Sequence, residues 1–351
     1  MKSVESAASQ ITDLGTKVKS VQLPEDLKEN ILTRLDQLAR LTNSPTFLPE
    51  FDSVNRYIDW VVNLPWETKT QDLLDLAHAK KVLDSRHYGL EEIKDRVIEY
   101  MSVMKLKQEK GEGEEVYRAP ILCFVGLVGT GKTTIAVSIA EALGRKLARI
   151  PFGGMGSPLD LRGQSRMHPE AEPGKIIKAL RIAGSRNPVI LLDEIDRVTD
   201  EGRASIMGVL VELLDPKQNY AFVDHYIDFP FNLSEVLFIA TANNTTNIAT
   251  AVMDRLEPLA MPSYTDHEKI TIGKNYVLPE KLKAAGIPQG ALTFDEEVWP
   301  QIVRPLGFDA GIRTLERTID GVVRKVARQI VEGKTQTIKI TPTNAKEFIP
   351  Q

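Results

Sequence analysis

Gly126-Leu127-Val128-Gly129-Thr130-Gly131-Lys132-Thr133 decides the fold, because it matches the phosphate-binding pattern G-x-x-x-x-G-K-[ST] in full. The apolar run 121–125 leads into it like a buried strand, and apolar residues at helical spacing follow it. A strand that passes through a glycine loop into a helix directs backbone N–H groups at one point. The stretch predicts a nucleotide phosphate site. An ordinary glycine turn is the alternative, but it gives Lys132 and Thr133 no reason to be there.

A pair of carboxylates follows a second apolar run. Residues 189–192 read Val-Ile-Leu-Leu, and Asp193 and Glu194 come directly after them. Such runs are typical of strands buried on both faces, with ligands beyond their carboxyl ends. We expect Asp193 to hold Mg²⁺ together with the Thr133 hydroxyl, and Glu194 to polarise a water for attack on the γ-phosphate. Two acidic residues capping the next helix is the alternative, but it does not explain their pairing with the glycine loop. The sequence therefore predicts hydrolysis of ATP.

Length and composition limit the class of protein. The chain has 351 residues, 42% hydrophobic and 26% charged, which is ordinary for a globular protein of two or three domains. Its net charge of −4 gives no support for nonspecific nucleic-acid binding, and no apolar stretch reaches the roughly 20 residues of a membrane span. There is one cysteine, the histidines show no metal-binding spacing, and residues 1–20 do not resemble a signal peptide. A reducing, intracellular compartment fits.

Hydrophobic periodicity predicts the order of the elements. Residues 1–20 are polar, and we expect them to be frayed. Helical patterns run from 24 to 107, at 24–38, around 54–61, at 71–84 and at 91–107; the first has Leu27, Ile31, Leu35 and Leu38 on one face. A solvated loop is expected at 111–115. Strands and helices alternate from 88 to about 258, which predicts a parallel sheet covered by helices. Helices dominate again from 265, at 265–285, 295–303 and 311–332, with a short strand at 337–340. The fold class is therefore α/β with helical parts on both sides.

Further motifs closely resemble those of the Lon ATP-dependent proteases. They are Tyr57-Ile58-Asp59-Trp60, Leu64-Pro65-Trp66, His87-Tyr88-Gly89-Leu90, Pro173-Gly174-Lys175-Ile176, and the segments 213–219, 224–226, 236–243, 253–257 and 311–317. The resemblance runs from about residue 24 to the end and implies an AAA+ module that works as a homo-hexameric ring. It implies an N-terminal helical arm region at 1–86, a P-loop subdomain with a five-stranded parallel sheet at 87–260, and a small helical lid at 261–351.

The resemblance also assigns roles to individual residues. Residues 126–133 bind the phosphates of ATP or ADP, with Asp193 supporting the metal and Glu194 activating water. Asn243 resembles the sensor that orients that water, Arg255 the arginine finger that reaches a neighbouring subunit's γ-phosphate, and Arg313 the sensor arginine of the lid. Tyr88 and Gly89 stand where the family lines its adenine pocket. A surface ion pair for Arg255 and a turn at the end of a strand for Asn243 are the alternatives.

Three departures from the family pattern bear on function. No Gly-Pro-Ser-Ala-Gly-like segment of the Ser-Lys peptidase occurs, so we do not expect this polypeptide to cleave peptides, and it resembles part of a longer enzyme. The aromatic residue of the first pore loop is replaced by His168, followed by Pro169, which stiffens a loop. Residues 197–207 differ from the second pore loop. These changes leave the threading of a substrate open.

The resemblance implies unfolded or damaged proteins, further copies of this chain and a peptidase domain as partners. A nucleotide-switched ring that binds proteins without threading them is the alternative function. A monomeric P-loop kinase is a third, but it leaves Arg255 and Arg313 without a role. Mitochondrial matrix, peroxisomal matrix and bacterial cytosol all stay open as locations, with the unusual pore residues favouring the peroxisome. DNA binding is also open.

Overall fold

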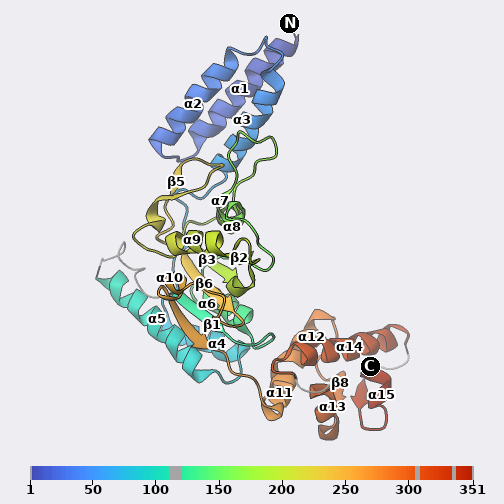
Figure 1. Ribbon diagram of the computed structural model, residues 1–351. Helices are drawn as coiled ribbons and strands as arrows, with labels where there is room; N and C mark the ends of the chain where they lie inside the picture. Colours follow the sequence, from blue (N-terminus) through green and yellow to red (C-terminus); the bar gives the residue numbers. More distant parts are fainter. Residues whose placement is uncertain (1, 111–120, 305–308, 334–336, 350–351) are drawn as a thin grey trace. The chain divides into compact units, whose positions relative to one another are not determined.

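The computed structural model describes residues 2–110, 121–304, 309–333 and 337–349 (Figure 1). The chain divides into two compact units: Met1–Asp75, Tyr100–Cys123 and Ala140–Pro258 form the first, and Leu76–Glu99, Phe124–Ile139 and Leu259–Gln351 the second. The loop predicted at 111–115 lies outside the described residues. The domain boundaries expected after residues 86 and 260 stay a prediction.

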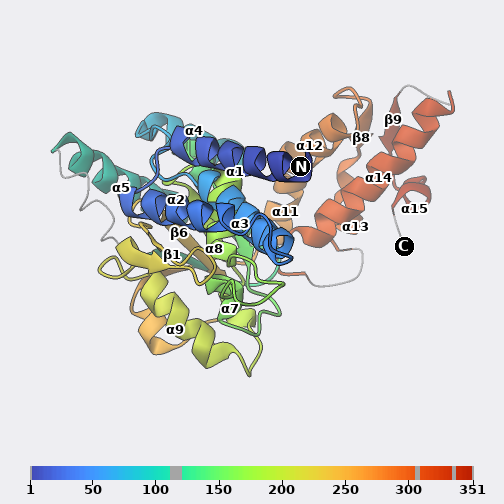
Figure 2. The same ribbon diagram turned by 90° about the horizontal axis from the view of Figure 1, so that it is seen from above.

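Three helices of the first unit form the N-terminal arm: α1 (Lys2–Ser20), α2 (Glu25–Ala39) and α3 (Phe47–Val62). They lie side by side in both ribbon views (Figures 1 and 2). Helix α2 begins after Pro24 with two acidic residues in its first turn, and it buries the four apolar residues of the predicted face. The helical arm is therefore confirmed for this stretch.

The prediction that residues 1–20 are frayed is wrong. Helix α1 occupies residues 2–20, and the side chains of Ile11, Leu14 and Val18 are buried, that of Val18 completely. These three residues are spaced at i, i+3 and i+7, so they form one narrow stripe on an otherwise polar helix. Packing against α2 and α3 stabilises a helix whose polar composition alone would not predict that it is ordered.

The next helices are α4 (Leu76–Arg86) and α5 (Glu91–Glu109). The first was predicted to begin at residue 71, five residues earlier than it does. Residues before it are held instead by the first unit: Leu73 N donates to the Leu143 carbonyl at 2.9 Å, and Asp72 accepts two hydrogen bonds from Arg145 at 2.6 and 2.7 Å. Because the Arg145 side chain is almost fully buried, this ion pair outweighs the local helical pattern.

A five-stranded sheet has the order β2-β3-β6-β1-β7. Its strands are β1 (Ile121–Val125), β2 (Leu147–Pro151), β3 (Val189–Asp193), β6 (Leu237–Ala242) and β7 (Leu256–Ala260). Strand β3 pairs in parallel with β2 and with β6, and every residue of β3 and β6 is buried. The predicted α/β fold with a parallel five-stranded sheet is thus confirmed. Strand β7 carries no strand signal because Pro258 lacks an N–H, and it lies at the edge of the sheet.

Helices and short elements connect these strands. They are α6 (Lys132–Ala142), α7 (Leu159–Arg162), α8 (Lys175–Ala183), η1 (Ile195–Arg197), α9 (Arg203–Leu213), η2 (Asn219–Ala221), the hairpin of β4 (Phe222–Val223) and β5 (Pro230–Phe231), and α10 (Thr250–Met253). The Leu64-Pro65-Trp66 motif packs against this hairpin. Trp66 donates from Nε1 to the Val61 carbonyl at 2.8 Å, and its ring lies 4.9 Å from that of Phe231, centroid to centroid. The motif therefore ends α3 and packs the chain that follows it.

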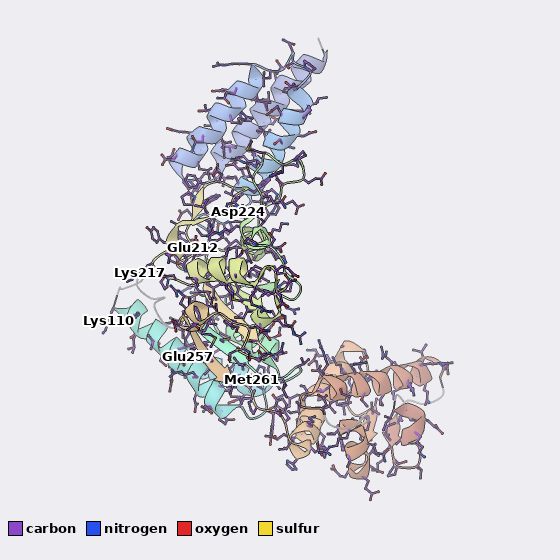
Figure 3. All side chains as sticks on the ribbon, viewed as in Figure 1. Lys110, Glu212, Lys217, Asp224, Glu257 and Met261 are labelled. Atoms are coloured by element: carbon purple, nitrogen blue, oxygen red, sulfur yellow. The ribbon has the colours of Figure 1, made fainter. Side chains whose placement is uncertain are left out.

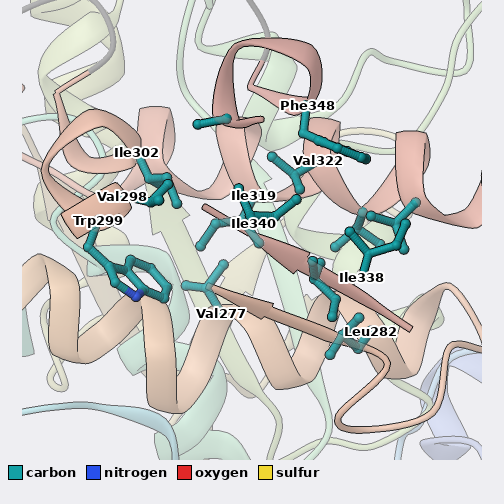
Figure 4. Packing of buried hydrophobic residues seen from close by; sticks show 14 of the residues in the cluster. Val277, Leu282, Val298, Trp299, Ile302, Ile319, Val322, Ile338, Ile340 and Phe348 are labelled. Carbon is teal, nitrogen blue, oxygen red and sulfur yellow. The ribbon is translucent and has the colours of Figure 1, made fainter. Parts of the chain in front are cut away.

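The lid of the second unit contains α11 (Asp266–Ile272), η3 (Gly273–Val277), α12 (Leu278–Ala284), η4 (Glu296–Val298), α13 (Trp299–Val303), α14 (Arg313–Val331) and α15 (Ala345–Phe348), with β8 (Leu292–Phe294) parallel to β9 (Ile338–Ile340). Its core gathers Trp299 with aliphatic residues of these helices and strands (Figure 4). The helix predicted over 265–285 is interrupted by a π-helical turn at η3. A Cβ on Gly273 would lie 2.6 Å from the Trp299 ring, so the indole packs directly on the backbone there.

We expect Val18→Ala to loosen α1 from the arm, because it removes two buried methyl groups worth about 2 kcal/mol of unfolding free energy. Limited proteolysis should release the N-terminal segment faster in this variant than in the parent. The neighbouring exposed Lys19→Ala is the matched control and should leave the rate unchanged. Equal cleavage of α1 in Val18→Ala and in the parent would contradict a packed first helix.

Candidate nucleotide site

The glycine loop has the backbone shape that a phosphate cradle requires. Gly129 and Gly131 have φ angles of +83° and +97°, a region that residues with a Cβ rarely adopt. Helix α6 begins at Lys132, whose ammonium donates to the carbonyls of Gly126 at 2.6 Å and Leu127 at 2.9 Å. The loop therefore holds a buried positive charge at its centre, next to a helix N-terminus.

Tyr264 lies beside this loop, and Tyr88 belongs to the same unit. Tyr264 donates from its hydroxyl to the Thr130 carbonyl at 3.2 Å, and burial raises the pKa of Tyr264 to about 12, so it stays a donor at neutral pH. Tyr88 packs, like Tyr264, against the hydrophobic core of the lid. Gly89 follows it with a φ of +61°, which turns the chain toward α5. The structure thus brings Tyr88, which Gly89 follows in the chain, to the lid core.

His87, which precedes this tyrosine, belongs to one of the quoted motifs, but the sequence alone assigned it no separate role. Its ring Nε2 lies 2.8 Å from the hydroxyl of Ser138 on α6. Burial, together with the charges of Lys94 and Arg86, lowers the pKa of His87 to about 4. The imidazole is therefore neutral at pH 7 and fixes the Tyr88 segment against the helix that follows the glycine loop.

The lid touches the glycine loop through main-chain atoms. Ile312 N donates to the Gly129 carbonyl at 3.0 Å, and a Cβ on Gly311 would lie 2.5 Å from the Gly129 carbonyl carbon. Arg313, the first residue of α14, is exposed, and its Cβ lies 3.3 Å from the position of a Cβ built on Gly129. Asp309 orders this turn by accepting from the N–H groups of Gly311 and Thr314 at 3.0 and 3.3 Å. The structure therefore brings Arg313 next to residues 126–133.

In the first unit, Asp193 ends β3 with a carboxylate that is only 4% exposed. Its Oδ1 accepts from the Thr241 hydroxyl on β6 at 2.5 Å, and its Oδ2 accepts from Arg149 Nε and Nη2 on β2 at 2.7 and 2.5 Å. Sequence reasoning missed both partners. They stand on neighbouring strands, so only the strand order and register reveal them.

Glu194 adopts a left-handed conformation, with φ of +58° and ψ of +50°. This conformation costs a residue other than glycine roughly 1–2 kcal/mol, so the surrounding contacts must hold it. Glu194 N donates to Thr241 Oγ1 at 2.9 Å, and the carboxylate, about one-third exposed, lies 3.5 Å from Arg197 Nη1. The turn directs the Glu194 side chain away from the buried course of β3.

Asn243 directly follows β6 and is positioned by a third acidic residue. The buried carboxylate of Asp196 accepts from the N–H groups of Asn243 at 3.1 Å and Asn244 at 3.4 Å. Asp193, Glu194 and Asn243 thus gather at the carboxyl ends of two adjacent strands, as the sequence predicted for the edge of a parallel sheet. Asp196 was not among the predicted site residues.

Arg255 has a partner that the sequence did not suggest. Its Nη2 lies 3.0 Å from Asp215 Oδ2, and its Nη1 donates to the Ala251 carbonyl at 2.7 Å. The Lys217 N–H, assisted by the Arg255 guanidinium, lowers the pKa of Asp215 below its ordinary value. The ion pair is thus made with an aspartate of the 213–219 motif.

The segment of the first predicted pore loop is tied at both ends. Asp224, labelled in Figure 3, is fully buried and accepts from Gly174 N at 2.7 Å, while His225 N donates to the Arg162 carbonyl at 2.6 Å. Between these two hydrogen bonds the loop contacts the arm, because the guanidinium of Arg166 lies 3.9 Å from the centre of the Tyr57 ring. Met167 and His168 are exposed.

The predicted site residues therefore fall into two sets, one in each unit. Asp193, Glu194, Asn243 and Arg255 belong to the first unit, and Tyr88, Gly89, residues 126–133 and Arg313 to the second. Within the described ranges, no group of three or more His, Cys, Asp or Glu side chains gathers to hold a metal ion. In the same ranges, no helix has the length and apolar character that crossing a bilayer requires.

A glycine loop that leads from strand β1 into helix α6, in a sheet whose strand β3 runs into an acidic pair, is typical of a P-loop ATPase. Residues 122–262 match the ATPase family associated with various cellular activities (AAA), and residues 283–339 match the Lon protease AAA+ ATPase lid domain. The chain belongs to the Lon family and carries the AAA+ module of that family.

Curated relatives agree with this assignment. The chain is 42% identical to Lon protease 2 of Thermus thermophilus over 350 residues, which cover 98% of this chain and 43% of that protein. It is 39% identical to the Lon protease of Syntrophomonas wolfei over 343 residues, or 97% of this chain and 41% of that protein. The Lon protease of Lawsonia intracellularis is 40% identical, over 98% of this chain and 40% of that protein. The chain thus spans about two fifths of the length of these relatives. All three are bacterial, so they give the expected peroxisomal location no support.

We expect Gly311→Ala to destabilise the contact between lid and glycine loop, because the added methyl group would overlap main-chain atoms of Gly129. Overpacking of this kind costs about 1–3 kcal/mol of unfolding free energy, which thermal unfolding would detect. Gly208→Ala on α9 is the matched control, since a Cβ there meets no atom within 4 Å, and it should be neutral or slightly stabilising. Equal melting temperatures of the Gly311→Ala variant and the parent would refute the close approach.

Proposed function

We propose that this AAA+ module binds ATP with Mg²⁺, hydrolyses it, and thereby drives the unfolding and translocation of protein substrates in a Lon-type protease. The observation that carries the proposal is the glycine loop with its buried lysine. Gly129 and Gly131 leave room for phosphate oxygens near the backbone, and the Lys132 ammonium stands at the mouth of a helix.

The donor set fits a nucleotide phosphate chain. Residues 126–133 would hold the phosphates through N–H groups and the Lys132 ammonium, which would exchange its bonds to the Gly126 and Leu127 carbonyls for phosphate oxygens. The Thr133 hydroxyl and the Asp193 carboxylate would hold Mg²⁺, a hard cation that prefers oxygen ligands. The ion, when bound, neutralises charge on the phosphates. Tyr88 and Gly89 would line the adenine.

The residues near the reacting phosphate would act by positioning. Glu194 is proposed to accept a proton from the attacking water, because its left-handed turn presents a carboxylate outside the strand. Asn243, fixed by Asp196 through its backbone, would orient the same water. Arg313 would sense the γ-phosphate from the lid, a role supported by its place beside Gly129.

Arg255 is proposed as the arginine finger for a neighbouring subunit in a homo-hexameric ring. Its ion pair with Asp215 holds the guanidinium in a defined orientation, and an exchange of Asp215 for a phosphate would deliver positive charge to the transition state. Unfolded or damaged proteins would be the substrates and a peptidase domain the downstream partner. The bacterial relatives favour the bacterial cytosol over an organelle matrix.

A nucleotide-switched ring that holds proteins without threading them is the second candidate. One observation favours it: the loop at 163–174 is tied at both ends and leans on Tyr57 through Arg166, and it carries His168 and Pro169 where the family offers an aromatic and an aliphatic residue. A stiffened loop would grip a passing chain less well.

We expect Glu194→Gln to retain nucleotide binding and to lose about 10²–10⁴-fold in ATP turnover, because the amide keeps the shape but cannot accept the proton. Lys132→Ala should lose nucleotide binding itself. Binding of a fluorescent ADP analogue and steady-state phosphate release measure the two effects separately. Parental turnover in Glu194→Gln would refute the role of the base, and parental binding in Lys132→Ala would refute the phosphate cradle.

A permanently unfolded protein should raise the ATPase rate of the chain several-fold if the module pulls on substrates. The same protein in its folded form is the control and should have a smaller effect. Phosphate release at saturating ATP measures both. An ATPase rate indifferent to the unfolded protein would favour the ring that binds without threading.

A further inference from the structure

The carboxylate of Asp193 already has a cationic partner. Arg149 places two N–H groups on Oδ2, at 2.7 and 2.5 Å, while the Thr241 hydroxyl bonds Oδ1 at 2.5 Å. An ionised carboxylate offers about four acceptor positions, so these three bonds occupy most of them. Any cation that binds through Oδ2 must open at least part of the contact with Arg149.

Asp193 and Arg149 differ sharply in solvent exposure. Asp193 is 4% exposed and stands on β3, between β2 and β6. The side chain of Arg149 is 56% exposed and stands on β2, an edge strand, where residues 149 and 151 face solvent. Because the aspartate is fixed and the arginine is at the surface, the guanidinium is the group that can move away.

We propose that Arg149 is an internal counter-ion for Asp193 that Mg²⁺–nucleotide displaces, so that nucleotide binding to this chain includes an exchange of cations on one buried carboxylate. The inference rests on the proposed function, since it takes Asp193 as a metal ligand. A buried carboxylate without a counter-ion is costly, so Arg149 stabilises the metal-free state. Arg149 is thus a positioning residue that raises the Mg²⁺ concentration needed to half-saturate the site.

The direction of the effect follows from competition. Removing the guanidinium takes a cationic partner from Asp193 when Mg²⁺ is absent, which destabilises that state alone. The metal-bound state has already lost the arginine contact and is changed little. The half-saturating Mg²⁺ concentration should therefore fall when Arg149 is replaced. A lysine at this position keeps the charge but loses the two-point contact, so its effect should be smaller.

The test titrates Mg²⁺ into Arg149→Met, Arg149→Lys and the parent at a fixed concentration of a fluorescent ADP analogue, starting in EDTA. We expect the half-saturating Mg²⁺ concentration to fall about tenfold in Arg149→Met and less in Arg149→Lys, a tenfold change corresponding to about 1.4 kcal/mol. Thermal unfolding in EDTA without nucleotide should show a lower melting temperature for Arg149→Met. Arg34→Met is the matched control, because Arg34 is 55% exposed and pairs with Glu50 at 2.8 Å on the arm of the same unit.

An unchanged or raised half-saturating Mg²⁺ concentration in Arg149→Met would overturn the inference. Weaker nucleotide binding at every Mg²⁺ concentration would overturn it too, since that pattern means that Arg149 binds phosphate. If Arg149→Met does not fold, Arg149→Lys decides by the same two criteria. Failure of the parent to bind the analogue with Mg²⁺ would instead refute the proposed function, which keeps the two results separate.

Discussion

A buried carboxylate at the end of a central strand needs partners, and the sheet supplies them to Asp193 from both sides. The parallel register pairs Leu192 with Ala240, which brings Thr241 of β6 beside Asp193. The Thr241 hydroxyl then donates to Asp193 and accepts from the N–H of Glu194, so one side chain holds both acids. A slip of one residue would turn Thr241 to the opposite face. The geometry of the acidic pair therefore depends on strand register, and so does the strained turn at Glu194.

Much of the fold could be predicted because its signals are local. The apolar run at 189–192 predicted β3, and the spacing of four apolar residues predicted α2. The errors arise where packing between distant segments decides the structure. Helix α1 has one narrow apolar stripe that becomes significant only against α2 and α3, and β7 contains a proline that an edge strand tolerates. The π-helical turn at η3 begins at Gly273, on which the Trp299 ring packs from a later segment of the chain.

The candidate site divides in the same way. The glycine loop and the Asp193–Glu194 pair are contiguous motifs, so the sequence predicted them with their residue numbers. Arg149 is one arginine among many until the pairing of β2 with β3 places it on Asp193. Asp215 likewise stands 40 positions from Arg255, and only the folded chain joins them. Partners on other strands or distant segments leave no spacing pattern in the sequence. The residues that position the site were therefore missed, whereas the residues expected to bind nucleotide lie in contiguous motifs and were predicted.

The contact between lid and loop limits how this module can respond to a ligand. The Gly129 carbonyl accepts a hydrogen bond from Ile312 N, and the Thr130 carbonyl accepts one from the Tyr264 hydroxyl. The side-chain hydroxyl of Thr130 donates to the Leu127 carbonyl. All of these acceptors belong to the peptide groups whose N–H ends would face a phosphate. A reorientation of those peptides on binding must therefore weaken or strengthen the bonds to the lid. The bond from Ile312 N to the Gly129 carbonyl joins main-chain groups, so substitution of side chains cannot remove it, whereas the bond from Tyr264 depends on a side-chain hydroxyl.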